Sequence, residues 1–216
     1  MRNTLIHRYL TEDIRTFQPL WDDQDTPLQV TFDWGSMIEF SDCNKYTLAR
    51  TFNEVKHNTK VIVEIGVARI SDPKFKTAIT SYEQTSTSVL LQSKLPETLY
   101  LGIDMEDRSF IHSYAPNTHT LKAKSEDYEV VLNKFKELNI TKIDFLFIDG
   151  WHSINQVIDE LWYLDFMKPG GVICYHDTNH HPGPTKIMDK FRPEYFEAVK
   201  HCQSENGWGL GVVKIK

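Results

Sequence analysis

The chain has 216 residues, of which 40% are hydrophobic and 25% charged, so it can bury the core of one α/β domain and is neither disordered nor collagen-like. Its 30 acidic residues outnumber 24 basic ones, and no basic cluster stands out, which argues against a nucleic-acid partner. No stretch approaches the roughly 18 apolar residues of a membrane span, and the N-terminus lacks the apolar region of a signal peptide, so we expect no membrane partner.

The N-terminal segment, residues 1–43, has scattered aromatic residues and no regular period, and we interpret it as a cap or lid on a main domain at 44–216. The cysteines are odd in number and widely spaced: Cys43, Cys174 and Cys202. This pattern indicates neither a disulfide framework nor a CxxC metal site, and it favours a reducing, cytoplasmic setting.

Helical periodicity starts at Asn44 and leads into a β-branched run over 61–65 that ends at Gly66. Further strands are expected at 99–103, 118–122, 143–148, 172–175, 195–199 and 210–215, and helices at 128–138, 154–162 and 187–191. We expect Pro169-Gly170-Gly171 to end the second of these helices. The alternation predicts an α/β fold: a doubly wound, mostly parallel, seven-stranded Rossmann-like sheet with helices on both faces.

In such a sheet the residues that follow the parallel strands share one edge, where ligands bind. Glu64 and Gly66 close the first strand; the glycine allows close approach of a ligand, although a plain turn is the commoner meaning of such a glycine. Asp104 ends the second strand 38 residues after Gly66, whereas a ribose-binding acid is expected about 20 residues past a glycine loop.

An insertion at 70–85 accounts for this excess, because Thr85 and the residues after it read as the capped start of the expected helix. A rival interpretation starts a helix at Asp72-Pro73 instead. The sequence leaves both open.

Two acids end neighbouring strands further along the chain. Asp149 and Asp177 are separated by one strand-helix-strand unit, so their carboxylates are expected to converge on an oxygen-preferring cation, with turn formation or helix capping as the alternative for Asp149. His152 and His176 fall at the same edge, and a histidine titrating near pH 6.5 suits a general base.

These segments together resemble the class I S-adenosylmethionine (SAM)-dependent methyltransferases, most closely the small-molecule O-methyltransferases that include macrolide-sugar enzymes. The resemblance covers about residues 44–216 and rests on Val63-Glu64-Ile65-Gly66-Val67-Ala68, Leu101-Gly102-Ile103-Asp104, Ile148-Asp149-Gly150-Trp151-His152 with Asp159, Pro169-Gly170-Gly171 and His176-Asp177.

The resemblance implies a cofactor, SAM, and a role for each matching residue. The cofactor-binding residues would be Glu64 and Gly66 at the methionine part, Asp104 at the ribose, Ser125 at the adenine, and Asp149. The catalytic residues would be His152 and Asp149, and the metal ligands would be Asp149, Asp177 and His176. In metal-dependent members the positions of Asp149 and Asp177 hold Mg²⁺, and an acid is frequent where His176 stands here. The position of His152 supplies the base that acts on an acceptor hydroxyl. The expected partner is therefore a small hydroxylated molecule, and a homo-oligomer is left open.

Other readings of the same residues remain. A nicotinamide-dependent oxidoreductase shares the sheet, but the segment after Gly66 lacks the second and third glycines of GxGxxG. An inactive methyltransferase-like binding protein is a second alternative, and a transition-metal site of His152, His176 and Asp177 is a third.

Overall fold

In the computed structural model, residues 1–16, 42–67, 85–179, 181–203 and 207–216 are described. Their helices are α1 (Arg2–Tyr9), α2 (Asp42–Val55), α3 (Ser86–Ser93), α4 (Tyr128–Glu137), α5 (Ile154–Asp159) and α6 (Pro182–Lys190), with 3₁₀ turns at Ile14–Thr16, Lys56–Asn58, Ser109–Ser113 and Glu160–Phe166 (η1, η2, η4 and η5). The strands are β1 (Val61–Ile65), β2 (Leu99–Asp104), β3 (Thr118–Lys122), β4 (Ile143–Ile148), β5 (Met167–His176), β6 (Phe196–His201) and β7 (Leu210–Ile215).

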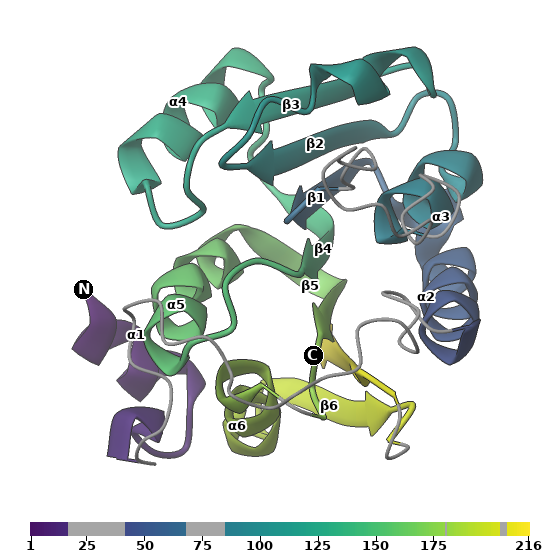
Figure 1. The fold of residues 1–216 in the computed structure, drawn as a ribbon. Coiled ribbons are helices and arrows are strands. Elements are labelled where there is room, and N and C mark those ends of the chain that lie inside the picture. The colour runs from purple at the N-terminus through teal and green to yellow at the C-terminus, as the bar shows by residue number, and fades with distance from the viewer. Residues whose placement is uncertain (17–41, 68–84, 180, 204–206) are drawn as a thin grey trace, which may run out of the picture.

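The strands form one seven-stranded sheet in the order β3-β2-β1-β4-β5-β7-β6. Strands β1 to β5 are parallel, whereas β7 runs antiparallel to both of its neighbours. The expected fold class is confirmed: a doubly wound, mostly parallel sheet with helices on both faces (Figure 1). The order reverses between β1 and β4, which is where ligands bind in open sheets of this kind.

Alternating residues of the central strands feed two hydrophobic cores. In β1, Ile62 packs with α2 and α3 residues on one face, while Val63 and Ile65 pack with residues of α1, α4, α5 and α6 on the other. In β4 every residue is buried, as expected for a strand covered on both faces. This two-sided burial holds the carboxyl ends of β1 and β4 rigidly at the edge of the sheet.

Local sequence explains where two of the helices start. Thr85 caps α3 by accepting a hydrogen bond from the backbone N–H of Ser88, as the sequence predicts. Ser153 caps α5 in the same way through the N–H of Gln156, so the capping role considered for Asp149 is filled by another residue. The possible helix from Asp72 and most of the proposed insertion lie outside the described residues.

The Pro169-Gly170-Gly171 segment does not end a helix, contrary to the prediction. The helical region that starts with α5 continues through a 3₁₀ turn to Phe166, and the three residues lie within β5. The pairing of β5 with β4 shifts register across this segment, as in a β-bulge, and Gly170 has a φ of +76° that suits glycine. Pro and Gly here mark an irregular strand start.

Residues 1–16 pack into the main core. Leu5, Ile6 and Ile14 are buried in the cluster that includes α5 and α6, and Leu10 forms a β-bridge with Phe191. Because 17–41 are outside the described residues and α2 starts at Asp42, the division into a cap at 1–43 and a main domain stays a prediction. None of the helices in the described ranges is long and apolar enough to cross a bilayer.

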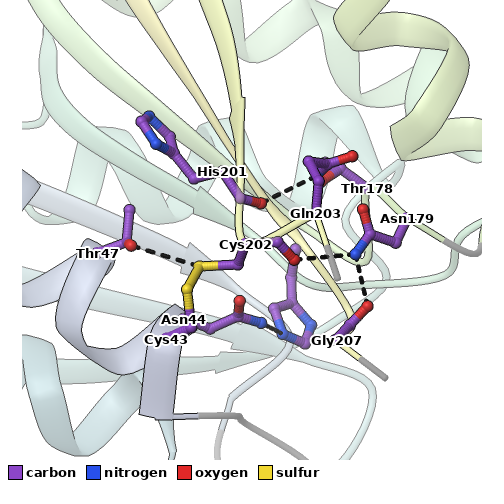
Figure 2. Close-up of a disulfide and its surroundings, with 10 residues drawn as sticks. Cys43, Asn44, Thr47, Thr178, Asn179, His201, Cys202, Gln203 and Gly207 are labelled. Carbon is purple, nitrogen blue, oxygen red and sulfur yellow. Dashed lines mark hydrogen bonds between the residues drawn. A yellow bond between two sulfur atoms is a disulfide. The ribbon is translucent and has the colours of Figure 1, made fainter. Parts of the chain in front are cut away.

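The cysteine prediction is wrong. Cys43 and Cys202 form a disulfide, with their Cα atoms 5.8 Å apart and 159 residues between them in sequence, while Cys174 is a buried free thiol. The two cysteines are far apart in sequence but close in space, because the start of α2 and the turn after β6 lie side by side in the fold (Figure 2).

Candidate active site

The backbone joins the ends of β1 and β4 closely at the switch point of the sheet. The N–H of Asp149 donates to the carbonyl of Ile65 at 2.8 Å, and Gly66 adopts a φ of +80°. A Cβ on Gly66 would lie 1.9 Å from the carbonyl oxygen of Asp149. Gly66 is therefore required because the backbone of Asp149 approaches it closely. The sequence interpretation expected a ligand to make this close approach.

The strand-end acids and histidines converge as expected. His152 Nε2 lies 2.7 Å from an oxygen of Asp177 and 3.3 Å from one of Asp149, while His176 Nδ1 lies 3.1 Å and 3.2 Å from the same two carboxylates. Asp177 and His176 are buried, and Asp149 and His152 are partly exposed. Two acids and two imidazoles thus share one compact cluster at the mouth of the sheet.

Backbone geometry fixes the two ends of this cluster. Asp177 has a φ of +61°, a left-handed conformation that non-glycine residues seldom adopt and that is frequent at functional sites. The N-terminus of α6 packs on the loop after β4, since the N–H of Gly183 donates to the carbonyl of His152 at 3.1 Å, and a Cβ at Gly183 would overlap that loop. The side chains of His152 and Asp177 are consequently held facing one another.

The charges within the cluster are strongly coupled. Burial by itself would raise the pKa of Asp149, but the charge of His176 and hydrogen bonds from both histidines outweigh it and lower the pKa to about 2. Burial would lower the pKa of His152, and the carboxylates of Asp177 and Asp149 overcome that effect and raise it to about 10. The carboxylates are thus ionised, and the imidazolium groups supply the compensating positive charge.

These donors fit a divalent cation. Ligand atoms of Asp149, His176 and Asp177 all lie within 4.8 Å of one another, and so do those of His152, Asp177 and His181. Carboxylate oxygens suit Mg²⁺, and adding an imidazole nitrogen extends the range to Mn²⁺ and other transition metals. The carboxylates of Asp149 and Asp177 are paired with histidines in this structure, and a cation would bind between these two carboxylates.

A second polar group lies under the loop after β4. Ser125 Oγ donates to Glu160 Oε1 at 2.6 Å, and the Gln156 amide donates to both side chains. Glu160 is fully buried, its Oε2 has no hydrogen-bond partner among the described residues, and burial raises its pKa to about 7. A Cβ on Gly150 would lie 3.1 Å from Glu160 Oε1, so this group adjoins the cluster around Asp149.

Glu160 is a buried acid beside the candidate site that the sequence interpretation missed. That interpretation singled out its neighbour Asp159, which instead forms an ion pair with Arg2 at 2.5 Å on the outer side of α5. The helical phase could have shown this, since Glu160 is four residues from Gln156 and therefore on the same face.

The other two expected cofactor residues have partners within the protein. Asp104 accepts hydrogen bonds from the N–H groups of Val67 and Glu106 and pairs with Arg108 at 3.2 Å, so it stays at the sheet edge. Glu64 is fully buried, accepts a hydrogen bond from Ser86 Oγ at 2.6 Å and one from the Tyr100 hydroxyl, and has a pKa raised by burial to about 7.

Glu64 therefore lies beneath the start of α3, where its buried carboxyl serves the packing of α3 on the sheet. It is also close enough to Asp149 for that charge to add to the effect of burial on its pKa.

An aromatic stack continues the site toward β7. The ring of His152 stacks on His181 with centroids 4.3 Å apart, and His181 stacks on Trp208 at 6.0 Å. The sequence interpretation gave these last two residues no role, because a histidine in a Pro- and Gly-rich loop and an isolated tryptophan carry no pattern. His180, beside them in sequence, lies outside the described residues.

The strand order, the switch point at β1 and β4, and the acids at the strand ends define a class I SAM-dependent methyltransferase domain. The chain belongs to a methyltransferase-domain family, whose sequence profile matches residues 70–178. No curated protein matches the sequence.

Solved methyltransferase structures share the fold. An O-methyltransferase from Bacillus cereus in complex with SAH superposes with a TM-score of 0.58 at 17% identity, covering 83% of each chain. TomG, an O-methyltransferase of tomaymycin synthesis from Streptomyces achromogenes in complex with SAM, gives 0.53 at 13% identity, covering 83% of this chain and 82% of TomG.

MycE, a methyltransferase from the mycinamycin biosynthetic pathway in complex with Mg, SAH and mycinamycin VI, gives a TM-score of 0.53 at 15% identity. The alignment covers 79% of this chain and 49% of MycE, so the chain spans about half the length of that enzyme.

Proposed function

We propose that this protein transfers the methyl group of SAM to a hydroxyl of a small molecule, assisted by a divalent cation, Mg²⁺ in the first instance, held by Asp149 and Asp177. The observation that carries the proposal is the convergence of these two carboxylates with His152 and His176 at the switch point of the sheet. A methyltransferase domain needs little more than alignment of the acceptor oxygen and a route for its proton, and this cluster offers both.

The cation would bind the carboxylates of Asp149 and Asp177, with His176 as a third ligand. When bound, it would polarise the acceptor hydroxyl and lower its pKa. The MycE complex with Mg and SAH supports a cation in a domain of this fold. The presence of His176 makes Mn²⁺ a second ion to test.

His152 is the proposed base. Without a cation the two carboxylates raise the pKa of His152 to about 10 and keep the ring protonated, and a cation bound to Asp149 and Asp177 would offset their charge and leave a neutral ring. In the reaction the acceptor oxygen attacks the methyl carbon, the bond from that carbon to the sulfonium sulfur breaks, and the hydroxyl proton passes to Nε2 of the neutral His152. Asp177 lies 2.7 Å from that nitrogen, so its carboxylate accepts a hydrogen bond from the protonated ring and stabilises it once the proton has been transferred.

We further propose that SAM lies along the edge from Gly66 to Asp104 and Ser125. Asp104 would accept the ribose hydroxyls after its contact with Arg108 loosens, and Ser125 with Glu160 would border the adenine. Glu64 would contribute indirectly, through the packing of α3. The acceptor would enter beside His152, where exposed Trp151 and the stack of His181 on Trp208 provide aromatic surface.

The test is a panel of sugars, phenols and polyketides incubated with SAM, with formation of SAH and of methylated product measured by mass spectrometry. The proposal expects turnover of at least one hydroxylated acceptor, loss of turnover with EDTA, recovery with Mg²⁺ or Mn²⁺, and loss in His152→Ala but not in the control His112→Ala. His112 lies outside the cluster and contacts Thr120. Unchanged turnover in His152→Ala would refute its role as base.

We also propose a cytoplasmic location, as the sequence interpretation has it. The Cys43–Cys202 disulfide argues against this location, since lasting disulfides are uncommon in reducing compartments. Alkylating free thiols at the moment of cell lysis and counting labelled cysteines decides it: labelled Cys43 and Cys202 support a reducing location, and unlabelled ones contradict it.

A further inference from the structure

Asn44, at the start of α2, contacts His176 of the candidate metal cluster on the side of the ring opposite the carboxylates. Its side chain is fully buried, and its Nδ2 lies 2.9 Å from Nε2 of His176. The other ring nitrogen of His176, Nδ1, faces Asp149 and Asp177. The imidazole therefore lies between the Asn44 amide and the two carboxylates, so that a partner on Nε2 controls the direction of Nδ1.

The adjoining residue ties Asn44 to the loop that carries Asp177. Cys43 is bonded to Cys202, whose carbonyl accepts a hydrogen bond from the Asn179 amide at 3.0 Å (Figure 2). Asn179 is two residues beyond Asp177, and its side chain also donates to the carbonyl of Gly207 at 2.6 Å. The disulfide and the hydrogen bond from Asn179 thus connect the residue next to Asn44 with the loop that carries Asp177.

The chemistry of an asparagine suits this place. A histidine that ligates a metal through one nitrogen generally has the other nitrogen held by a hydrogen-bond partner, which fixes the ring. An amide can donate to a bare ring nitrogen through NH₂ or, turned over, accept from a ring N–H through its carbonyl oxygen. Asn44 can therefore hold His176 in either form.

We propose that Asn44 is a positioning residue that fixes the ring of His176, and that the Cys43–Cys202 disulfide keeps Asn44 in place. The consequence, which rests on the proposed function, is that breaking the disulfide weakens cation binding. Reduction by a dithiol transfers two electrons and two protons to the cysteines and leaves the reductant as its own disulfide. Cys43 is exposed and Cys202 partly exposed, so a reductant can reach this disulfide, and Cys174 is already a free thiol that a dithiol leaves unchanged.

The contact itself is tested without any metal, from the ¹⁵N and ¹H signals of the histidine rings in metal-free protein. We expect Asn44→Ala to shift the ring nitrogen signals of His176, and Cys43→Ser/Cys202→Ser, or dithiol treatment of the wild type, to shift them in the same direction. Thr47→Val is the matched control. Thr47 lies one turn further along α2, and its hydroxyl lies 3.4 Å from the Cys202 sulfur, whereas the ring nitrogens of His176 face Asn44, Asp149 and Asp177. If the ring signals of His176 are unchanged in Asn44→Ala, the positioning role of Asn44 is wrong. If they change in Asn44→Ala but not in the cysteine variant or the reduced protein, the role of the disulfide is wrong.

The consequence is tested by titrating Mn²⁺ alone into each protein and following the bound ion by electron paramagnetic resonance. Loss of a residue that orients a metal ligand typically costs about 10- to 100-fold in affinity, so we expect at least a tenfold rise in Kd for Asn44→Ala and for the reduced protein, and none for Thr47→Val. Equal Kd values in all proteins contradict the consequence. A wild type that binds no Mn²⁺ contradicts the proposed cation site instead, while the ring spectra still decide whether Asn44 positions His176.

Discussion

Replacing Gly66 by alanine should be among the most damaging single-methyl changes in the molecule. The φ of +80° at Gly66 costs an L-residue roughly 1–2 kcal/mol. The added Cβ would also lie 1.9 Å from the carbonyl oxygen and 2.6 Å from the carbonyl carbon of Asp149. Those atoms are backbone and cannot rotate away, so forcing them apart adds about 1–3 kcal/mol, as overpacking does in a filled core. We expect a total loss of about 3 kcal/mol in the free energy of unfolding.

Gly170→Ala is the control for this substitution. Gly170 has a nearly equal φ of +76°, but a Cβ there would meet no atom within 4 Å. We therefore expect a loss of only about 1 kcal/mol, from backbone conformation alone. Urea unfolding followed by tryptophan fluorescence measures both. Equal losses in the two variants would refute the claim that Gly66 is required by the close approach of Asp149.

Two further predictions concern the residues around α5. The raised pKa of Glu160 means that the folded protein keeps a proton between about pH 4.5 and 7 that the unfolded chain has lost, so Glu160 makes stability fall as pH rises through this window, by up to about 3 kcal/mol. Glu160→Gln should flatten that part of the pH dependence of the urea midpoint, and an unaltered slope would contradict the assignment. Ser153→Ala should lower the free energy of unfolding by about 1 kcal/mol, because it removes the 3.1 Å hydrogen bond from the N–H of Gln156 that caps α5. Ser153→Asp should retain most of that stability, since aspartate also caps helices. Thermal melting measures both, and an unchanged melting temperature in Ser153→Ala would contradict the role of Ser153 as the cap.

Much of the fold could be predicted because local patterns determine it. Continuous apolar runs such as 143–148 identify buried strands, and apolar residues at helical spacing identify the helices that cover them. The same logic placed Asp149 and Asp177 together, since both directly end strands of one parallel sheet. The 167–171 segment was misread because Pro and Gly end helices and also interrupt strands, and only pairing with β4 distinguishes the two.

The contacts that depend on tertiary packing could not be predicted in this way. Asn44 meets His176 across 132 residues, and Cys43 meets Cys202 across 159, with no periodicity that relates them. Glu64 fits a ligand-binding position in sequence, but its side chain points to the α2 and α3 face, where Ser86 and Tyr100 satisfy it. The position of a residue in a strand shows which edge of the sheet it is near. The helices that pack on its face of the sheet determine what its side chain contacts.

The most direct test of the central claim is a Mn²⁺ titration of the wild type beside Asp149→Asn/Asp177→Asn, with Asp159→Asn as control because Asp159 pairs with Arg2 away from the cluster. If the two strand-end carboxylates form the cation site, the wild type and the control bind one ion with equal affinity and the double variant loses it. Equal binding by all three proteins, or binding by none, would contradict the account.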